Sequence, residues 1–268
     1  GTLTENRMEV NALFPEDNRE RIFEIGVLCN DASLDGGEYM GDPVDTALLR
    51  AASSRAKIDP AALQSEFPLE NEFTFDNTRK RMSVIRKDGT GFLVAVKGAP
   101  EAILSLCTRR WTPKGEESFT SADQKPILEK ATQMATEGLR VLAFAEKKTS
   151  SLEMSEEQTE SNLIFVGLVG LADPPRLEVR DAIQACQQAG IRTIMVTGDH
   201  PITARSIANQ VGLKNDGRIL TGPELDQLDD TALEEIVGKT SIYARTTPEH
   251  KLRIVYALQT RGERVAAT

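Results

Sequence analysis

Polar residues follow an apolar run in the last third of the chain, at a position where a strand is expected to end. Thr197, Gly198 and Asp199 follow the β-branched run 191–196, and Pro201 then opens a helical pattern. Ligands of open α/β sheets bind at the carboxyl ends of strands, so this turn lies where chemistry is usually done. The alternative interpretation is that Asp199 only caps the next helix, an ordinary use of Asp.

Other polar residues follow neighbouring expected strands. Asp173 comes after the apolar run 163–171, Arg245 follows the strand expected at 241–243, and Lys251 lies one or two turns into the next helix. With Thr197 and Asp199 they would converge on one sheet edge, which suits the handling of a phosphoryl group and its metal. No single residue is specific for this chemistry, but the joint pattern is.

A second set of candidates lies in the first half of the chain. Lys97 ends an expected strand just before the flexible Gly98, where it is suited to a phosphate or a ring nitrogen, although such a lysine is more often merely solvated. Phe75 lies beside the basic run 79–81, a combination suited to stacking a base and neutralising phosphates. By itself, Phe75 is more often a core residue.

The periodicity of apolar residues changes along the chain and predicts two kinds of domain. The first part favours an antiparallel α+β domain in which the polar tract 147–161 is an exposed loop. Its helices are expected at 19–32, 43–55, 100–107 and 121–137, and its strands at 72–75, 81–86, 91–97 and 139–145. Asp88-Gly89 is a hairpin signal. After residue 162 strands at 163–171, 191–196 and 241–243, with an apolar stretch at 265–267, alternate with helices at 176–189, 201–211 and 248–261. This alternation predicts a parallel, doubly wound α/β sheet and a boundary near residue 165.

Composition narrows the classes of function. The net charge of −9 over 268 residues argues against a nucleic-acid-binding surface, and three distant cysteines indicate buried thiols in a reducing compartment. The longest apolar run is about half of what a bilayer span needs. A P-loop at 238–240 is excluded because Leu233 stands where the phosphate-binding turn requires glycine.

Five motifs, in this order, resemble the cytoplasmic signatures of P-type cation-transporting ATPases of the type II group, which includes calcium and sodium/potassium pumps. They are KGAPE at 97–101, GLRVLA at 138–143, DPPR at 173–176, TGDHPITA at 197–204 and ARTTPEHK at 244–251. The opening GTLTENRM resembles the segment directly after the family's phosphorylated Asp-Lys-Thr. The closing 265–268 resembles the approach to its magnesium loop, and a start at Gly1 without Met fits a piece cut from a longer chain.

The resemblance implies a role for each matching residue. Phe75 would stack on adenine, Lys97 and Gly98 would line the adenine pocket, and Asp45 would contact the base, although helix capping alone explains an acid at that position. Lys80 and Arg140 would face the phosphates. The phosphorylation site would contain Thr197, Gly198, Asp199, Arg245 and Lys251, with Asp173 at its hinge. Val44 and Asn77 depart from the calcium pumps, which have Thr and Arg there, and Arg79 is a candidate substitute for the second.

The implied fold is an antiparallel-sheet nucleotide-binding domain, 10–165, inserted into a parallel-sheet phosphorylation domain of the haloacid dehalogenase type, formed by 1–9 and 166–268. The implied parent is a membrane pump that uses ATP and Mg²⁺ and forms an aspartyl phosphate. Its partners would be ATP and the transmembrane and actuator domains of the same chain, with no nucleic acid. This segment would lie on the cytoplasmic side as a monomer that binds nucleotide without hydrolysing it, because the phosphorylated Asp and the main metal ligands would lie beyond its ends.

Two other classes of function remain as alternatives. A free-standing phosphatase of the haloacid dehalogenase type requires an Asp-x-Asp pair, which does not occur in this sequence. A regulatory or interaction module without a ligand predicts that nucleotide has no effect on stability, whereas a bound ligand must stabilise the fold by mass action.

Overall fold

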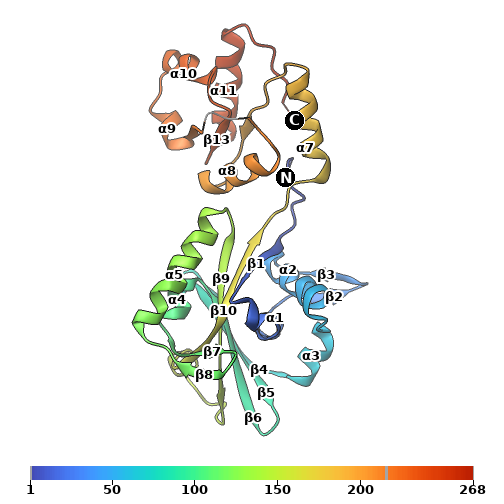
Figure 1. Ribbon diagram of the computed structural model, residues 1–268, viewed down its shortest axis with the longest axis vertical. Coiled ribbons are helices and arrows are strands. Elements are labelled where there is room, and N and C mark those ends of the chain that lie inside the picture. The colour runs from blue at the N-terminus through green and yellow to red at the C-terminus, as the bar shows by residue number, and fades with distance from the viewer. Residues whose placement is uncertain (1, 215–216, 268) are drawn as a thin grey trace. The chain divides into compact units, whose positions relative to one another are not determined.

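The computed structural model describes residues 2–214 and 217–267, which form two compact units (Figure 1). Unit 1 contains residues 2–6 and 136–138 and the described residues from 173 onward. Unit 2 contains residues 7–135 and 139–172. Unit 1 therefore combines segments from both ends of the chain, and the larger unit 2 lies between them in sequence.

Unit 2 is built on an eight-stranded sheet with the strand order β4-β5-β6-β9-β10-β7-β8, in which β1 also pairs with β10. All pairs are antiparallel except β10 with β7. The strands are β1 (Glu9–Phe14), β4 (Leu69–Asp76), β5 (Arg81–Asp88), β6 (Gly91–Gly98), β7 (Cys107–Thr112), β8 (Gly115–Ser118), β9 (Arg140–Thr149) and β10 (Leu163–Ala172). The hairpin between β5 and β6 turns at Gly89, whose φ of +57° suits the predicted Asp-Gly turn.

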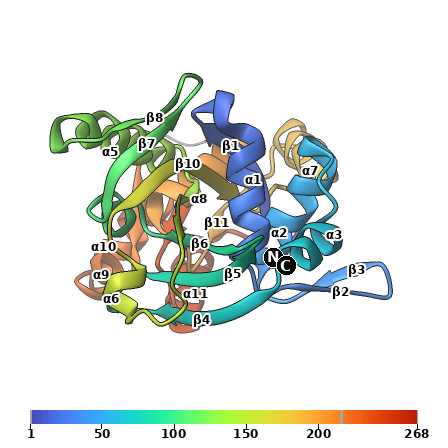
Figure 2. The same cartoon turned by 90° about the horizontal axis from the view of Figure 1, so that it is seen from below.

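Helices cover both faces of this sheet (Figures 1 and 2). They are α1 (Arg19–Leu28), α2 (Pro43–Ala51) with a π-helical continuation (Ala52–Ala56), α3 (Pro60–Glu66), α4 (Pro100–Leu104), α5 (Ser121–Thr136) and α6 (Glu156–Thr159), with a 3-10 turn at Glu16–Asn18 and a small hairpin of β2 (Ser33–Asp35) and β3 (Glu38–Met40). Successive residues of a strand point to opposite faces, so Ala95 packs under α1 and α2, whereas Val94 and Val96 pack under α4 and α5.

The strand β10 corrects the predicted domain boundary. The sequence assigned 163–171 to the parallel sheet, but this strand lies inside unit 2 between β9 and β7, and the division between the units falls after Ala172 instead of near residue 165. A strand buried on both faces is a continuous apolar run in either kind of sheet, so composition could not separate the two. Gly167 lets β10 pass close to α1, since a Cβ there would lie 2.5 Å from Ile22 Cδ1.

Unit 1 contains a three-stranded parallel sheet with the order β11-β13-β12. Its strands are β11 (Met195–Val196), β12 (Ile219–Thr221) and β13 (Ile242–Ala244), and its helices are α7 (Leu177–Gln188), α8 (Pro201–Gln210), α9 (Gly222–Asp226), α10 (Asp230–Val237) and α11 (Pro248–Thr260). Ile242 and Ala244 belong to a core with α7 and α8, and Tyr243 belongs to a second core with α10 and α11. Parallel strands with helices on both sides agree with the α/β pattern predicted for this part.

Several local predictions were wrong. The tract 147–161 is not an exposed loop, because β9 continues to Thr149, α6 follows and Glu160 is buried. Of the strand expected at 191–196 only Met195–Val196 forms. The hairpin β2-β3, the pair β7-β8, β12, α3, α9 and α10 had no prediction, because their apolar patterns are too short to show a period.

Two global predictions can be compared with the structure. Within residues 2–214 and 217–267, no helix is both long and apolar enough to cross a membrane. All three cysteines are free, with Cys29 and Cys107 buried as expected and Cys186 only half-buried. Burial raises the pKa of both buried thiols to about 12, so they stay protonated at neutral pH.

A buried carboxylate attaches α1 to the sheet. Glu146 on β9 is 2% exposed and accepts hydrogen bonds from Arg21 on α1, one of them 2.9 Å long from Nε, and from the Trp111 indole. Asn18, just before α1, donates to the Val166 carbonyl at 2.9 Å. The charge of the buried Glu146 carboxylate is therefore compensated by the partly exposed Arg21 guanidinium.

We predict that Glu146→Gln lowers the free energy of unfolding by about 3 kcal/mol, because the Arg21 guanidinium loses its buried counter-ion and keeps the more exposed Glu24. The matched control is Glu116→Gln, which removes an exposed partner of Arg109 and should cost less than about 1 kcal/mol. Urea denaturation of both variants measures the difference. Equal losses would show that the Glu146 cluster is no more important than a surface pair.

Candidate functional site

The candidate residues of unit 2 gather at one end of its sheet. The pairing register places Asp76 of β4 opposite Arg81 of β5, and Arg81 opposite Gly98 of β6. On its other side Gly98 lies opposite Ala143 of β9. Phe75, Lys80 and Lys97 are direct neighbours of these residues, so the register brings the three candidates to the same end of the sheet.

Asp45 and Lys97 form an ion pair inside unit 2. Lys97 Nζ donates to Asp45 Oδ1, and the two residues are 8% and 5% exposed. The other carboxylate oxygen accepts the backbone N–H of Asp31 at 3.1 Å. Asp45 lies in the first turn of α2, whose start is fixed by Asp42 accepting the Val44 N–H at 2.8 Å. The predicted capping thus positions the charged pair, although no spacing in the sequence revealed that they meet.

A tight turn follows Phe75. Asp76 Oδ1 accepts the backbone N–H groups of Thr78 at 2.9 Å and Arg79 at 2.8 Å, and the Asp76 carbonyl accepts that of Lys80 at 2.6 Å. These N–H groups, Arg79 first, hold the pKa of Asp76 below its usual value. Phe75 itself is 57% exposed, so the interpretation of this ring as a core residue is wrong.

Gly98 is required by the close approach of two backbones. A Cβ at this position would lie 2.6 Å from the Lys80 carbonyl oxygen and 2.5 Å from Arg81 Cβ. The same Lys80 carbonyl accepts the Ala99 N–H at 2.9 Å, and Lys80 has a positive φ of +55°. The lack of a side chain at Gly98 therefore allows the backbone of β6 to lie against the backbone of Lys80.

Two candidate phosphate contacts are exposed. Lys80 Nζ lies 3.1 Å from Glu101 Oε1, and both side chains are more than half exposed, so the pair is weak and easily exchanged. The pKa of Glu101 is lowered by its own backbone N–H and by Lys80. Arg140, at the start of β9, is exposed, and no hydrogen bond of its side chain is found in the described part of the chain. Arg79, the suggested substitute at Asn77, is instead paired with Glu160 and Glu156.

In unit 1 the candidate residues form a connected loop pair. Thr197 Oγ1 donates to Asp199 Oδ2 at 2.8 Å and accepts the Asp199 N–H at 3.1 Å. The Arg245 N–H donates to the Asp199 carbonyl at 2.9 Å, and both Thr246 N and Oγ1 donate to the Thr197 carbonyl. Gly198 and Asp199 are exposed, and the N-cap of α8 is His200, so Asp199 does not cap that helix. The strand ends of β11 and β13 therefore meet as the sequence predicted.

The two remaining candidates lie on other segments of unit 1. Lys251 is exposed on α11, and its backbone N–H donates to the Thr247 carbonyl at 3.2 Å. Asp173 lies directly after β10, in a stretch that runs beside the N-terminal segment, where Thr4 forms a bridge with Pro175. Of the residues predicted to converge, Thr197, Asp199 and Arg245 are in contact, Arg245 through its backbone N–H.

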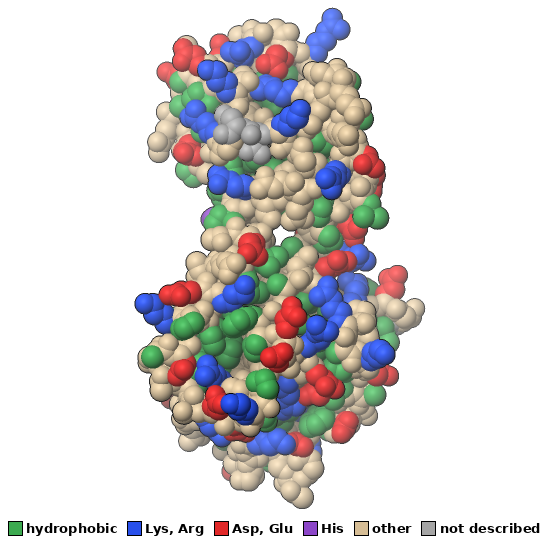
Figure 3. Space-filling model, in the orientation of Figure 1, with side chains coloured by type: hydrophobic (Ala, Val, Ile, Leu, Met, Phe, Trp, Pro, Cys, Tyr) green, Lys and Arg blue, Asp and Glu red, His purple; other side chains and the backbone are tan. Residues whose placement is uncertain are grey.

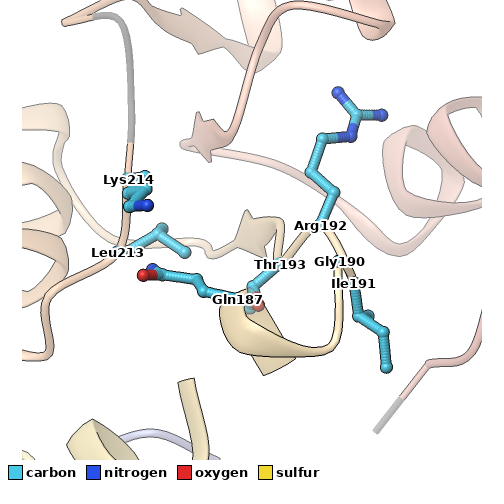
Figure 4. Close-up of a pocket in the computed structure, with 7 residues that line it drawn as sticks. All are labelled: Gln187, Gly190, Ile191, Arg192, Thr193, Leu213 and Lys214. Carbon is cyan, nitrogen blue, oxygen red and sulfur yellow. The ribbon is translucent and has the colours of Figure 1, made fainter. Parts of the chain in front are cut away.

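A shallow cavity of about 220 Å³ in unit 1 contains none of the candidate residues (Figure 4). The Arg192 guanidinium points away from Gln187 and donates to the carbonyls of Val237 and Gly238. The cavity is lined by Gln187, Gly190, Ile191, Arg192, Thr193, Leu213 and Lys214. We assign the candidate site by the contacts described above, because this hollow has no convergent charged groups.

Neither a large charged patch on the visible face of unit 2 nor a metal-binding cluster is found in the described part of the chain. On the visible face of unit 2, acidic and basic side chains alternate without a large patch of one sign (Figure 3). Among residues 2–214 and 217–267, no three His, Cys, Asp or Glu side chains lie close enough together to hold a metal ion. Asp199 with the Thr197 hydroxyl supplies oxygen ligands but is not a complete magnesium site.

Two residues at the unit 2 site were not predicted from the sequence. Asp31 supplies a backbone N–H to Asp45, and Glu160 pairs with Arg79 and Arg81. A backbone contact leaves no signal in residue type. Glu160 lies in a Ser-, Glu- and Thr-rich tract, where only its place just before the apolar run of β10 distinguishes it from its neighbours.

Comparison with known proteins identifies the family. Residues 18–178 match the model of the P-type ATPase cytoplasmic domain N. Curated relatives include calcium-transporting ATPase 1 of Bacillus cereus, 39% identical over 100% of this chain and 32% of its own length, and the calcium-transporting ATPase of Bacillus subtilis, 37% identical over 100% and 30%. Calcium-transporting ATPase 1 of Saccharomyces cerevisiae is 39% identical over 94% of this chain and 27% of its own length, so the chain spans about a third of such relatives. Because the family model covers more than half of the chain, and because the motifs lie on the strand ends described above, this chain belongs to the P-type ATPase family.

Proposed function

We propose that this chain is the ATP-binding part of a P-type ATPase that couples ATP hydrolysis, through an aspartyl phosphate, to cation transport across a membrane. Unit 2 would be the nucleotide-binding domain and unit 1 part of the phosphorylation domain, with transmembrane and actuator domains in the same parent chain. The observation that carries the proposal is that the buried Lys97–Asp45 pair and the exposed Phe75 lie at the same end of the sheet. The relatives' names suggest calcium as the cation.

The adenine base would lie against Phe75. A ring that is 57% exposed loses contact with water when a base stacks on it, which favours binding. Asp45 uses one acceptor position for Lys97 and one for Asp31, and a carboxylate offers about four, so positions remain for an exocyclic amino group. Lys97 would donate to a ring nitrogen from a fixed position, because Asp45 holds it.

The phosphates would extend toward exposed cations. The Lys80 ammonium forms a weak surface pair with Glu101, which a phosphate can replace at little cost. Arg140 offers a planar group of donors suited to phosphate oxygens. Mg²⁺ would neutralise phosphate charge when ATP is bound, and we assign it no complete ligand set among the described residues.

The loop pair of unit 1 would act on the transferred phosphoryl group. Arg245 and Lys251 are cations of the kind that spread its charge, and Thr197 and Asp199 hold each other by a hydrogen bond of 2.8 Å. In the family, the phosphorylated aspartate lies just before the segment that residues 1–8 of this chain resemble.

We predict that ATP, with or without Mg²⁺, shifts the amide NMR signals of residues around Asp45, Phe75, Lys80, Lys97 and Arg140. Phe75→Ala should weaken ATP binding by about 1 to 3 kcal/mol, the usual value of one base stack. The matched control is Leu69→Ala, since Leu69 is also half exposed but lies at the other end of β4. Unchanged ATP affinity in a folded Phe75→Ala variant would refute the pocket assignment.

Lys97→Met tests the contact with the base. It should weaken ATP, ADP and AMP by the same factor, and it should lower stability by about 3 kcal/mol because Asp45 is left buried and unpaired. The double variant Asp45→Asn/Lys97→Met should regain part of that stability while affinity stays low. Calorimetric titration with the three nucleotides and urea denaturation measure both effects. A loss confined to ATP would place the ammonium at the phosphates instead.

Asp199→Asn tests the loop pair. The amide keeps an acceptor for Thr197 but removes the charge, so ATP affinity of this chain should stay within about twofold, since the site proposed for ATP is in unit 2. In a full-length ATPase carrying this chain, the same change should abolish most of the phosphoenzyme formed from labelled ATP. Asp181→Asn, on the exposed side of α7, is the control. A normal phosphoenzyme level for Asp199→Asn would exclude the proposed role.

A further inference from the structure

Glu160 is a buried carboxylate that belongs to none of the proposed contacts with ATP. It follows α6, lies just before β10 and is 1% exposed. Its Oε1 accepts from Arg79 Nη1 at 2.6 Å and from Ser83 Oγ at 2.8 Å. Its Oε2 accepts from Arg81 Nε at 2.6 Å. Burial of a carboxylate is costly even when the carboxylate is paired in this way. The burial of Glu160 therefore needs a reason beyond charge balance.

The segment that carries Glu160 is held in place by its own contacts. Ser155 and Gln158 form a reciprocal capping box at the start of α6. Lys147 on β9 donates to the Gln158 carbonyl and, at 2.9 Å, to the Ser161 carbonyl. Burial lowers the pKa of Lys147. Glu160 therefore projects from a fixed segment.

The two arginines that Glu160 binds hold both sides of the Phe75–Lys80 turn. Arg79 Nη2 donates to the Thr74 carbonyl at 2.7 Å, directly before Phe75. Arg81 Nη1 donates to the Arg79 carbonyl at 3.1 Å, directly before Lys80. The side chains of these arginines are only 17% and 19% exposed. The two guanidinium groups carry like charges, and Glu160 lies between them as the shared counter-ion.

We infer that Glu160 is a positioning residue for nucleotide binding, which acts through Arg79 and Arg81 to fix the turn that presents Phe75 and Lys80. The inference rests on the proposed function of unit 2. It also assigns Arg79 to the support of the turn and not to the phosphates, because its guanidinium contacts Glu160, Glu156 and the Thr74 carbonyl.

The matched control is Glu146, the other carboxylate that is 2% exposed or less and holds an arginine against the same sheet. Glu146 contacts Arg21 and Trp111 but no residue of the turn. A general loss of stability would therefore follow from either Glu146→Gln or Glu160→Gln. Only Glu160→Gln should change the turn.

The first experiment measures ATP affinity by calorimetric titration at a temperature where both variants are folded. Glu160→Gln should lower the affinity for ATP about fivefold or more, because residues in one contact network commonly have interaction energies of that size. Glu146→Gln, outside this network, should lower the affinity less than about twofold. In the Phe75→Ala background the effect of Glu160→Gln should shrink, because the positioned ring is gone. Equal effects of the two glutamine variants, or full additivity with Phe75→Ala, would overturn the inference.

The second experiment needs no nucleotide. Amide hydrogen exchange of Arg79 and Lys80, whose N–H groups bond Asp76, should become at least severalfold faster in Glu160→Gln and stay unchanged in Glu146→Gln. If the unmodified chain does not bind ATP, the proposed function fails, and faster exchange still supports the positioning of the turn. Unchanged exchange refutes that positioning whether or not ATP binds.

Discussion

The structure of unit 2 depends on one constraint, the compensation of charge inside a sheet that helices cover on both faces. Each buried carboxylate described above has a cationic partner from a distant segment: Asp45 has Lys97, Glu146 has Arg21, and Glu160 has two arginines. The desolvation cost of each group is offset only when both partners are in place. These pairs therefore connect segments that are far apart in the sequence.

This constraint explains why the candidate site lies at a strand end. Inside the sheet, alternate side chains enter one of two apolar cores, which leaves no place for an unpaired polar group. At the ends of β4 and β6 the cores stop, and the chain turns at Asp76 and at Gly98. A half-exposed ring and a buried ion pair then lie at the same end of the sheet, one suited to stacking and the other to hydrogen bonding.

Local chemistry was predictable from the sequence where a residue acts on its own neighbours. The Asp42 cap, the Asp-Gly hairpin, the long helices and the parallel βα alternation of unit 1 all depend on adjacent residues, and the structure contains them. The place of β10 was not predictable, because an apolar run does not reveal which strands lie beside it. Glu160 was hidden for the same reason, since its partners lie 79 and 81 residues earlier in the chain.

The resemblance identified candidate residues but could not say what holds them. Gly98 illustrates the difference, because its family motif suggests a ligand contact, whereas the structure gives it a steric role against the Lys80 carbonyl. Gly98 can have both roles if the close approach of two backbone segments shapes the pocket and also positions the side chains that line it. In that case the residues between motifs decide how rigid the pocket is. Glu160 is such a residue, since a small error in the position of the ring costs stacking contacts that no other group in the turn replaces.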